Sequence, residues 1–159
     1  MNDKKAEIKA YLSDARSAVL TAVSPLTPTD WAKPIYSEGS TWQISDILRH
    51  VADSQSGMMQ LMQGIQVGGG GVPEDFDLAR WNAKRVKKYE EKSPADLIAK
   101  LEQDQINLFA FIDTLEAVDW DKSGRHATLR IMSIEEICRL IADHETIHAG
   151  EITTALRGE

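Results

Sequence analysis

The sequence is poor in cysteine, with one in 159 residues. A single thiol cannot form a disulfide within the chain, so a disulfide-stapled fold is excluded and a reducing compartment is expected. Long apolar runs are also lacking. No stretch approaches the roughly 18 residues that a membrane-spanning helix needs, and the first residues have no apolar signal-peptide core. We therefore expect a cytoplasmic protein with no membrane partner.

Basic residues are also fewer than acidic residues. The chain has 18 lysines and arginines and 25 acidic residues, which gives a net charge of −7. Because domains that bind nucleic acids are typically basic, the acidic balance predicts no nucleic-acid partner. The composition is otherwise that of an ordinary globular protein, with 42% hydrophobic residues. The length predicts a single domain over residues 1–159 with a sizeable core.

Alternating strand patterns are lacking, and apolar residues recur at helical spacing almost throughout the chain. Long amphipathic helices are predicted at about residues 3–23, 44–65, 94–117 and 133–155, with a short helix near 77–90 and a flexible glycine loop at 68–71. Capping signals mark three of the helix starts: Ser40 with Gln43, Ser93 with Asp96, and Ser133 with Glu136. The sequence thus predicts an all-α four-helix bundle with a short extra helix between the second and third long helices.

Histidines lie on the apolar faces of two predicted helices. His144 and His148 are four residues apart, which places their Cβ atoms about 5–6 Å apart on one face, and His50 lies on the second long helix. A lone histidine on such a face is usually a packed core residue. Burying three uncoordinated imidazoles would instead require several compensating hydrogen bonds. We interpret His50, His144 and His148 as ligands of a divalent metal with open coordination positions, zinc or nickel first and iron as a further candidate.

Two glutamates accompany the histidine pair. Glu151 lies one turn beyond His148, where it could ligate the metal or orient a ligand, although a solvated glutamate is the simpler alternative. Glu145 completes the His-Glu-x-x-His signature of zincin metalloproteases, in which the glutamate is the general base. Proteolysis is not expected, because Thr154 stands where the longer signature has its third histidine. Glu145 and Glu151 remain the candidate catalytic residues.

Three other side chains are of interest. Trp81 and Asn82 are candidate substrate-binding residues at the mouth of a pocket, since tryptophan supplies apolar area and asparagine orients polar groups. Packing of the short helix explains Trp81 equally well. His126 falls in an expected loop, and we interpret it as a surface residue.

Three segments together resemble the DinB/YfiT-like superfamily. They are WQISDILRHVAD from Trp42, the pair Trp81-Asn82, and HETIHAGEI from His144. The first segment also resembles the metal-binding domain of mycothiol-dependent maleylpyruvate isomerases. The resemblance implies an up-down-down-up order of the four helices, a homodimer, and a divalent metal held by the three histidines. Members of the family often carry glutamine where this chain has Glu151.

The resemblance also implies a class of activity. Characterised members are mostly metal-dependent thiol transferases that use mycothiol, bacillithiol or glutathione, and others are described as metal-dependent hydrolases. The leading expectation is therefore an enzyme in which the metal activates a small thiol co-substrate or water against a small-molecule substrate. The alternative is a non-catalytic, metal-stabilised bundle that binds a small molecule or a protein partner. A metal-free bundle with packed histidines is the third interpretation.

Overall fold

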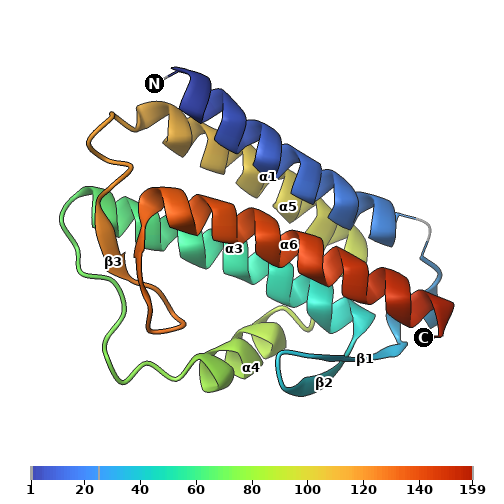
Figure 1. The fold of residues 1–159 in the computed structure, drawn as a ribbon. Helices are drawn as coiled ribbons and strands as arrows, with labels where there is room; N and C mark the ends of the chain where they lie inside the picture. Colours follow the sequence, from blue (N-terminus) through green and yellow to red (C-terminus); the bar gives the residue numbers. More distant parts are fainter. Residues whose placement is uncertain (1, 25, 159) are drawn as a thin grey trace.

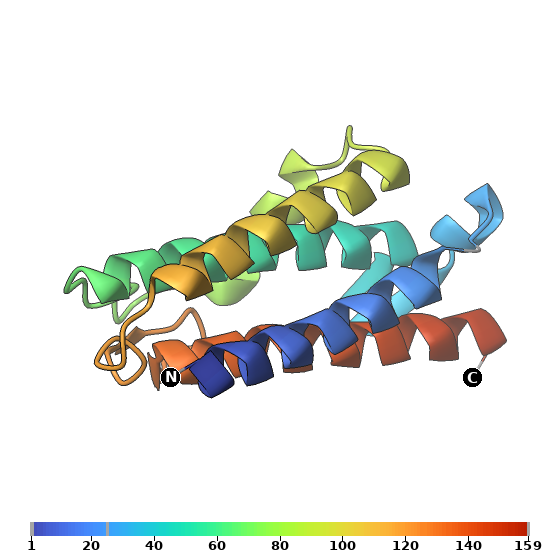
Figure 2. The ribbon, with the colours of Figure 1, turned by 90° about the horizontal axis from the view of Figure 1, so that it is seen from above.

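Four long helices lie side by side in the structure, a computed structural model that describes residues 2–24 and 26–158 (Figures 1 and 2). These helices are α1 (Asn2–Val23), α3 (Ile44–Gln66), α5 (Pro94–Thr114) and α6 (Ile134–Arg157). Helices α1 and α6 run in one direction, and α3 and α5 run in the opposite direction (Figure 1). The predicted all-α bundle and its up-down-down-up order are confirmed. None of the described helices is long and apolar enough to cross a membrane.

Shorter elements connect the bundle helices within the described residues. They are α2 (Pro28–Trp31), α4 (Leu78–Lys88), the antiparallel hairpin of β1 (Pro34–Ser37) with β2 (Ser40–Gln43), and the antiparallel hairpin of β3 (Ser123–Arg125) with β4 (Ile131–Ser133). Helix α4 is the predicted extra helix. The sequence did not predict the strands, because three or four residues are too few to show alternation. Each hairpin runs directly into a helix that carries histidines: β2 into α3, and β4 into α6.

Two of the three capping signals are confirmed. Ser93 Oγ accepts a hydrogen bond from the backbone N–H of Asp96 at 3.1 Å, and Ser133 Oγ accepts from Glu136 at 3.2 Å. The third signal is wrong, because Ser40 begins strand β2 and Gln43 is itself the N-cap of α3.

The turn between β1 and β2 has an unusual residue in it. Ser37 pairs with Ser40, so Glu38 and Gly39 form a two-residue turn. Their φ angles are 49° and 77°, and positive φ at both central positions is what a type I′ hairpin turn requires. Glycine adopts this conformation freely, whereas a residue with a side chain is destabilised in it by roughly 1–2 kcal/mol. A glutamate held there at that cost points to a role for its side chain.

The glycine loop after α3 is fastened to strand β3. The backbone N–H of Arg125 donates to the Gly70 carbonyl at 2.8 Å, and that of Val72 donates to the Arg125 carbonyl at 2.9 Å. Between them, Gly71 has a φ of 89°, and a Cβ atom there would lie 2.2 Å from the Arg125 carbonyl oxygen. Only glycine is compatible with this approach, so this part of the predicted flexible loop has a fixed place beside the hairpin.

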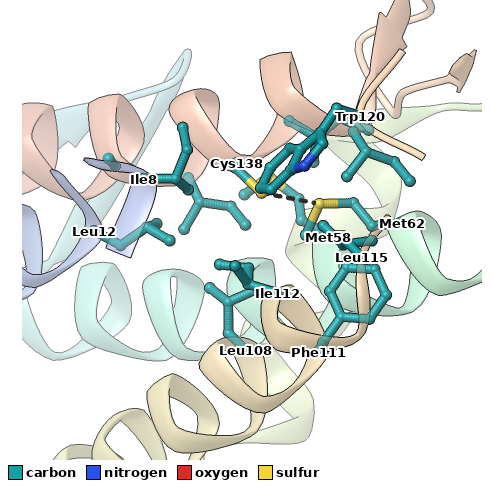
Figure 3. Close-up of a cluster of buried hydrophobic side chains, with 14 of the residues drawn as sticks. Ile8, Leu12, Met58, Met62, Leu108, Phe111, Ile112, Leu115, Trp120 and Cys138 are labelled. Carbon is teal, nitrogen blue, oxygen red and sulfur yellow. Dashed lines mark hydrogen bonds between the residues drawn. The ribbon is translucent and has the colours of Figure 1, made fainter. Parts of the chain in front are cut away.

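The hydrophobic core consists of two clusters along the bundle. One, shown in Figure 3, contains Trp120 and places the Cys138 sulfur 3.5 Å from the Met62 sulfur. The other surrounds the start of α3, including Ile44 and Leu48. Burial raises the pKa of the Cys138 thiol to about 12, so this cysteine is a protonated packing residue rather than a nucleophile.

A buried polar layer lies where the two clusters meet. Arg16 of α1 forms a bidentate ion pair with Glu145 of α6, at 2.9 Å from Nε and 2.6 Å from Nη2. The same guanidinium donates to the Gln55 side chain of α3 and to the Leu101 carbonyl of α5. All four long helices therefore contribute to one hydrogen-bonded layer, in which Arg16 and Glu145 are each 3% exposed.

Candidate metal centre

The three predicted histidines converge between two antiparallel helices. His50 projects from α3, and His144 and His148 project from successive turns of α6. The Nε2 atom of His144 lies 2.9 Å from that of His50 and 3.0 Å from that of His148. His50 and His148 are buried, whereas His144 is partly exposed. The structure thus brings one nitrogen of each imidazole to a common point.

A carboxylate missed by the sequence interpretation completes the cluster. Glu38 Oε1 lies 3.0 Å from His144 Nε2 and 3.4 Å from His148 Nε2, and its Oε2 lies 3.1 Å from His50 Nε2. The four ligand atoms all lie within 4.8 Å of one another. The strained turn between β1 and β2 is what carries this side chain to the histidines. The Glu-Gly pair was the available signal, because such a pair is compatible with a tight hairpin turn.

Glu151 orients His148 from the side opposite the cluster. Its Oε2 lies 2.6 Å from His148 Nδ1, and Ser37 Oγ donates to both Glu151 oxygens at 3.1 and 2.9 Å. A carboxylate on Nδ1 assigns the proton to that nitrogen, so the lone pair of Nε2 faces the cluster. This carboxylate–histidine arrangement is the usual support of a metal-ligating imidazole.

A substitution at Glu151 should therefore weaken metal binding without removing a ligand. We expect Glu151→Ala to lower metal affinity by about 10–100-fold, the range found when such supporting partners are lost. Glu151→Gln is the matched control, because its amide oxygen still accepts from Nδ1–H and a smaller loss is expected. Competition with a chromogenic chelator measures both. Equal affinities in the parent and Glu151→Ala would contradict the orienting role.

The carboxylates of Glu38 and Glu151 make the cluster electrostatically favourable for a positively charged ion. Burial acts to raise the pKa of Glu38, but the close approach of the three imidazole nitrogens outweighs burial and holds the pKa well below its usual range. Burial lowers the pKa of His144 to about 4. Around His148 burial acts in the same direction, but hydrogen bonds with Glu38 and Glu151 outweigh it and raise the pKa.

These groups fit a divalent metal ion. Three imidazole nitrogens that meet within hydrogen-bond distance cannot all be satisfied by one another, since each Nε2 is either a donor or an acceptor. An ionised carboxylate and nitrogen lone pairs are the donors that zinc, nickel and iron accept in proteins. His50, His144 and His148 would be the ligands, with Glu38 as a fourth ligand or a base beside them.

A pocket of about 540 Å³ adjoins the cluster. Glu38, His50 and His144 line it, together with the predicted residues Trp81 and Asn82. Asn82 Nδ2 donates to Glu38 Oε2 at 3.3 Å. That Trp81 and Asn82 bind substrate stays a prediction, but both lie on the pocket that opens at the histidines.

The structure places two other residues differently from the sequence interpretation. Glu145 lies on the core side of α6, in the ion pair with Arg16, and is not brought to the histidines. His126 is not a surface residue: it is 7% exposed and lines the pocket. Its Nδ1 accepts from the backbone N–H of Thr128 at 3.2 Å, which holds the ring inside the turn between β3 and β4.

The family of the chain follows from its sequence profile. The profile of the DinB superfamily matches residues 11–152, which include the three histidines. The chain belongs to the DinB superfamily. No curated protein gives a significant match to this DinB superfamily protein.

Two solved structures share the fold of this DinB superfamily protein. YfiT from Bacillus subtilis, described as a probable metal-dependent hydrolase with an unusual four-helix bundle topology, superposes with a TM-score of 0.80 at 20% identity, over 99% of this chain and 89% of YfiT. The colibactin self-resistance protein ClbS, crystallised with double-stranded DNA, gives a TM-score of 0.78 at 15% identity, over 96% of this chain and 95% of ClbS. At these identities the similarity establishes the fold.

The ClbS complex overturns one expectation. The acidic composition predicted no nucleic-acid partner, and that exclusion is wrong, because a protein of the same fold binds double-stranded DNA. Net charge sums the whole surface, whereas binding of phosphates depends on where the charges lie. The homodimer, the small-molecule substrate and the cytoplasmic location stay predictions.

Proposed function

We propose that this DinB superfamily protein is a metal-dependent enzyme that binds a divalent ion through His50, His144 and His148 and activates a small nucleophile beside it. The observation that carries the proposal is the position of the cluster. His50, His144 and the Glu38 carboxylate line a pocket of about 540 Å³, a size typical of small-molecule sites. A purely structural metal site would be closed by its own ligands.

When bound, a divalent ion supplies Lewis acidity, which lowers the pKa of a coordinated water or thiol toward neutrality. The chain's own residues provide the rest. Glu38 is ionised and accepts the proton of the nucleophile, while Asn82 donates to Glu38 and holds its carboxylate in place. The centroid of the Trp42 ring lies 5.2 Å from that of the His50 ring, so the indole packs beside this histidine.

Water is the nucleophile that we propose first, with a small thiol as the second candidate. Apart from histidines, the charged side chains among the described residues of the pocket are Glu38 and Asp53, both acidic. Asp53 is paired with Arg85, and no lysine or arginine among the described residues lines the pocket to pair with the carboxylates of thiols such as glutathione and bacillithiol, whereas water needs no binding site of its own. The description of YfiT as a probable metal-dependent hydrolase also supports water ahead of a thiol as the nucleophile.

Turnover assays of metal-loaded and chelated protein test the proposal. Chromogenic esters and amides serve as hydrolase substrates, and bacterial thiols with a chromogenic electrophile serve as transferase substrates. Ester or amide turnover that chelation abolishes would support the hydrolase. Turnover only with a thiol would favour the transferase instead. Bound metal without turnover in either assay would favour the non-catalytic, metal-stabilised bundle.

The proposed role of Glu38 yields a further prediction. Glu38→Gln keeps the shape of the side chain but removes its proton acceptor, so kcat should fall by about 10²–10⁴-fold while metal stays bound. Steady-state kinetics and elemental analysis of the same sample separate the two effects. Glu102→Gln, at an exposed position on α5, is the matched control. An unchanged kcat would exclude Glu38 as the base, and loss of metal would make it a ligand.

A further inference from the structure

The pocket is elongated along helix α3. Its lining residues recur on one face of that helix, from His50 at the metal centre to Ile65 near the helix end. Fifteen residues of α-helix correspond to about 22 Å. At the far end the pocket is lined by the glycine loop at 69–71, which is hydrogen-bonded to β3. The pocket is therefore a groove with the metal centre at one end.

Two glycines inside α3 leave the groove open. Gly57 and Gly64 lie seven residues apart, on the same face of the helix, and both line the pocket. A Cβ atom added at either position would meet no atom within 4 Å, so neither glycine serves a close approach of another element. Glycine within a helix is destabilising by roughly 0.5–1 kcal/mol relative to alanine. The absence of side chains at these two positions leaves space in the groove.

The walls of the groove beyond the metal centre are mainly apolar. They include Met58, Leu61 and Ile65 of α3, Leu140 of α6, and Val72, Phe76, Leu78 and Trp81 of the segment that faces them. The acidic Asp53 lies near the metal end and is paired with Arg85 at 2.6 Å. A chain without charge therefore suits the groove, because it buries apolar surface against these walls without leaving a charge unpaired.

We propose that the groove binds an extended, uncharged acyl or alkyl chain of the substrate, with the reacting group at the metal centre. The placement of the reacting group rests on the proposed function. Binding of the chain itself depends only on the shape and apolar lining of the groove. The substrate class is thus a neutral ester, amide or similar electrophile that carries a medium-length hydrocarbon chain.

Displacement of the neutral dye Nile red by butanol, hexanol, octanol and decanol measures chain binding without catalysis. With the full-length protein, the inhibition constant should fall three- to fourfold for each added methylene, as burial of a methylene predicts, until the groove is full. Gly57→Leu places a side chain about 10 Å from His50 along the helix, and Gly64→Leu about 21 Å. Gly57→Leu should abolish the gain from longer chains, and Gly64→Leu should leave it unchanged, because an extended decanol anchored at the metal centre ends well short of that position.

Gly150→Leu is the matched control. Gly150 is a helix-interior glycine of α6 that is exposed, lies outside the pocket, and also has no atom within 4 Å of an added Cβ. All three substitutions should preserve or raise the melting temperature, because leucine favours helix more than glycine does. If a stable Gly57→Leu protein loses the dependence of binding on chain length, the cause is therefore a blocked groove and not unfolding. Equal binding of all four alcohols by the parent, or unchanged length dependence in Gly57→Leu, would overturn the proposal.

A parallel kinetic series separates this proposal from the proposed function. p-Nitrophenyl esters from acetate to decanoate should show kcat/KM rising with chain length in the metal-loaded parent, and not in Gly57→Leu. Length-dependent alcohol binding without ester, amide or thiol turnover would retain the groove and overturn the enzymatic proposal. Metal-dependent turnover that is independent of chain length, together with equal alcohol binding, would retain the enzyme and overturn the groove.

Discussion

A His148→Ala variant is expected to purify without metal, whereas the parent should carry a near-stoichiometric divalent ion. His148 is the histidine most firmly held, since it is 1% exposed and its Nδ1 is 2.6 Å from Glu151. Loss of one of three imidazole ligands should lower affinity beyond the roughly 100-fold upper range for loss of a supporting partner. Metal-dependent turnover should fall to that of the chelated parent. Elemental analysis, with no metal added after lysis, measures the first effect.

His126→Ala is the control for that experiment, because His126 lies on the same pocket but outside the cluster of ligand atoms. Its metal content should equal that of the parent. His144→Ala is a second test at a partly exposed ligand, where a cavity in the core is less of a concern. Metal retained in both His148→Ala and His144→Ala would mean that these imidazoles serve packing and do not bind the metal. The proposed metal-dependent function at this site would then be wrong.

Arg16→Met should be the most destabilising of the substitutions considered. It leaves the Glu145 carboxylate buried without its partner and removes the guanidinium bonds to Gln55 and to the Leu101 carbonyl. Breaking a buried ion pair in this way typically lowers the free energy of unfolding by about 3–5 kcal/mol. For a domain of this length that corresponds to a decrease in melting temperature of about 6–20 °C. Urea and thermal unfolding measure the two quantities.

The double variant Arg16→Met/Glu145→Met is the counterpart of that single change. It removes both charges and replaces them with apolar side chains, so much of the lost stability should return. The same protein tests the two roles of Glu145. A stable double variant that binds metal and retains turnover would identify Glu145 as a structural residue of the polar layer. A stable double variant that binds metal but has lost turnover would restore Glu145 as a catalytic candidate.

The histidine cluster could be predicted because helical periodicity determines which residues share a face. His144 and His148 lie one turn apart, and Glu151 lies nearly two turns beyond His144, so all three project from one side of α6. The same periodicity also separates Glu145 from His144 by about 100° around the helix axis. The zincin signature, not the helix geometry, made Glu145 a candidate, and the structure places it on the side that meets Arg16.

Glu38 could not be predicted in the same way. Its position depends on a two-residue turn with positive φ at both residues and on how the hairpin packs against α6. A four-residue strand is too short for its side-chain periodicity to indicate either feature. The elongated groove was likewise beyond the sequence, because Gly57 and Gly64 resemble ordinary helix-weakening residues until the empty space beside them is seen.

The proposed metal ligands come from distant parts of the chain: His50 and His144 are 94 residues apart in the sequence. Unfolding separates them, so the intact three-histidine site exists only in the native state. If the proposed metal binds there, each tenfold rise in free metal above the dissociation constant would add about 1.4 kcal/mol to the stability of the whole bundle by mass action. In a metal-starved cell the unfolded fraction would then rise, and with it the exposure of the chain to proteases. The abundance of the protein would thereby follow the supply of its metal.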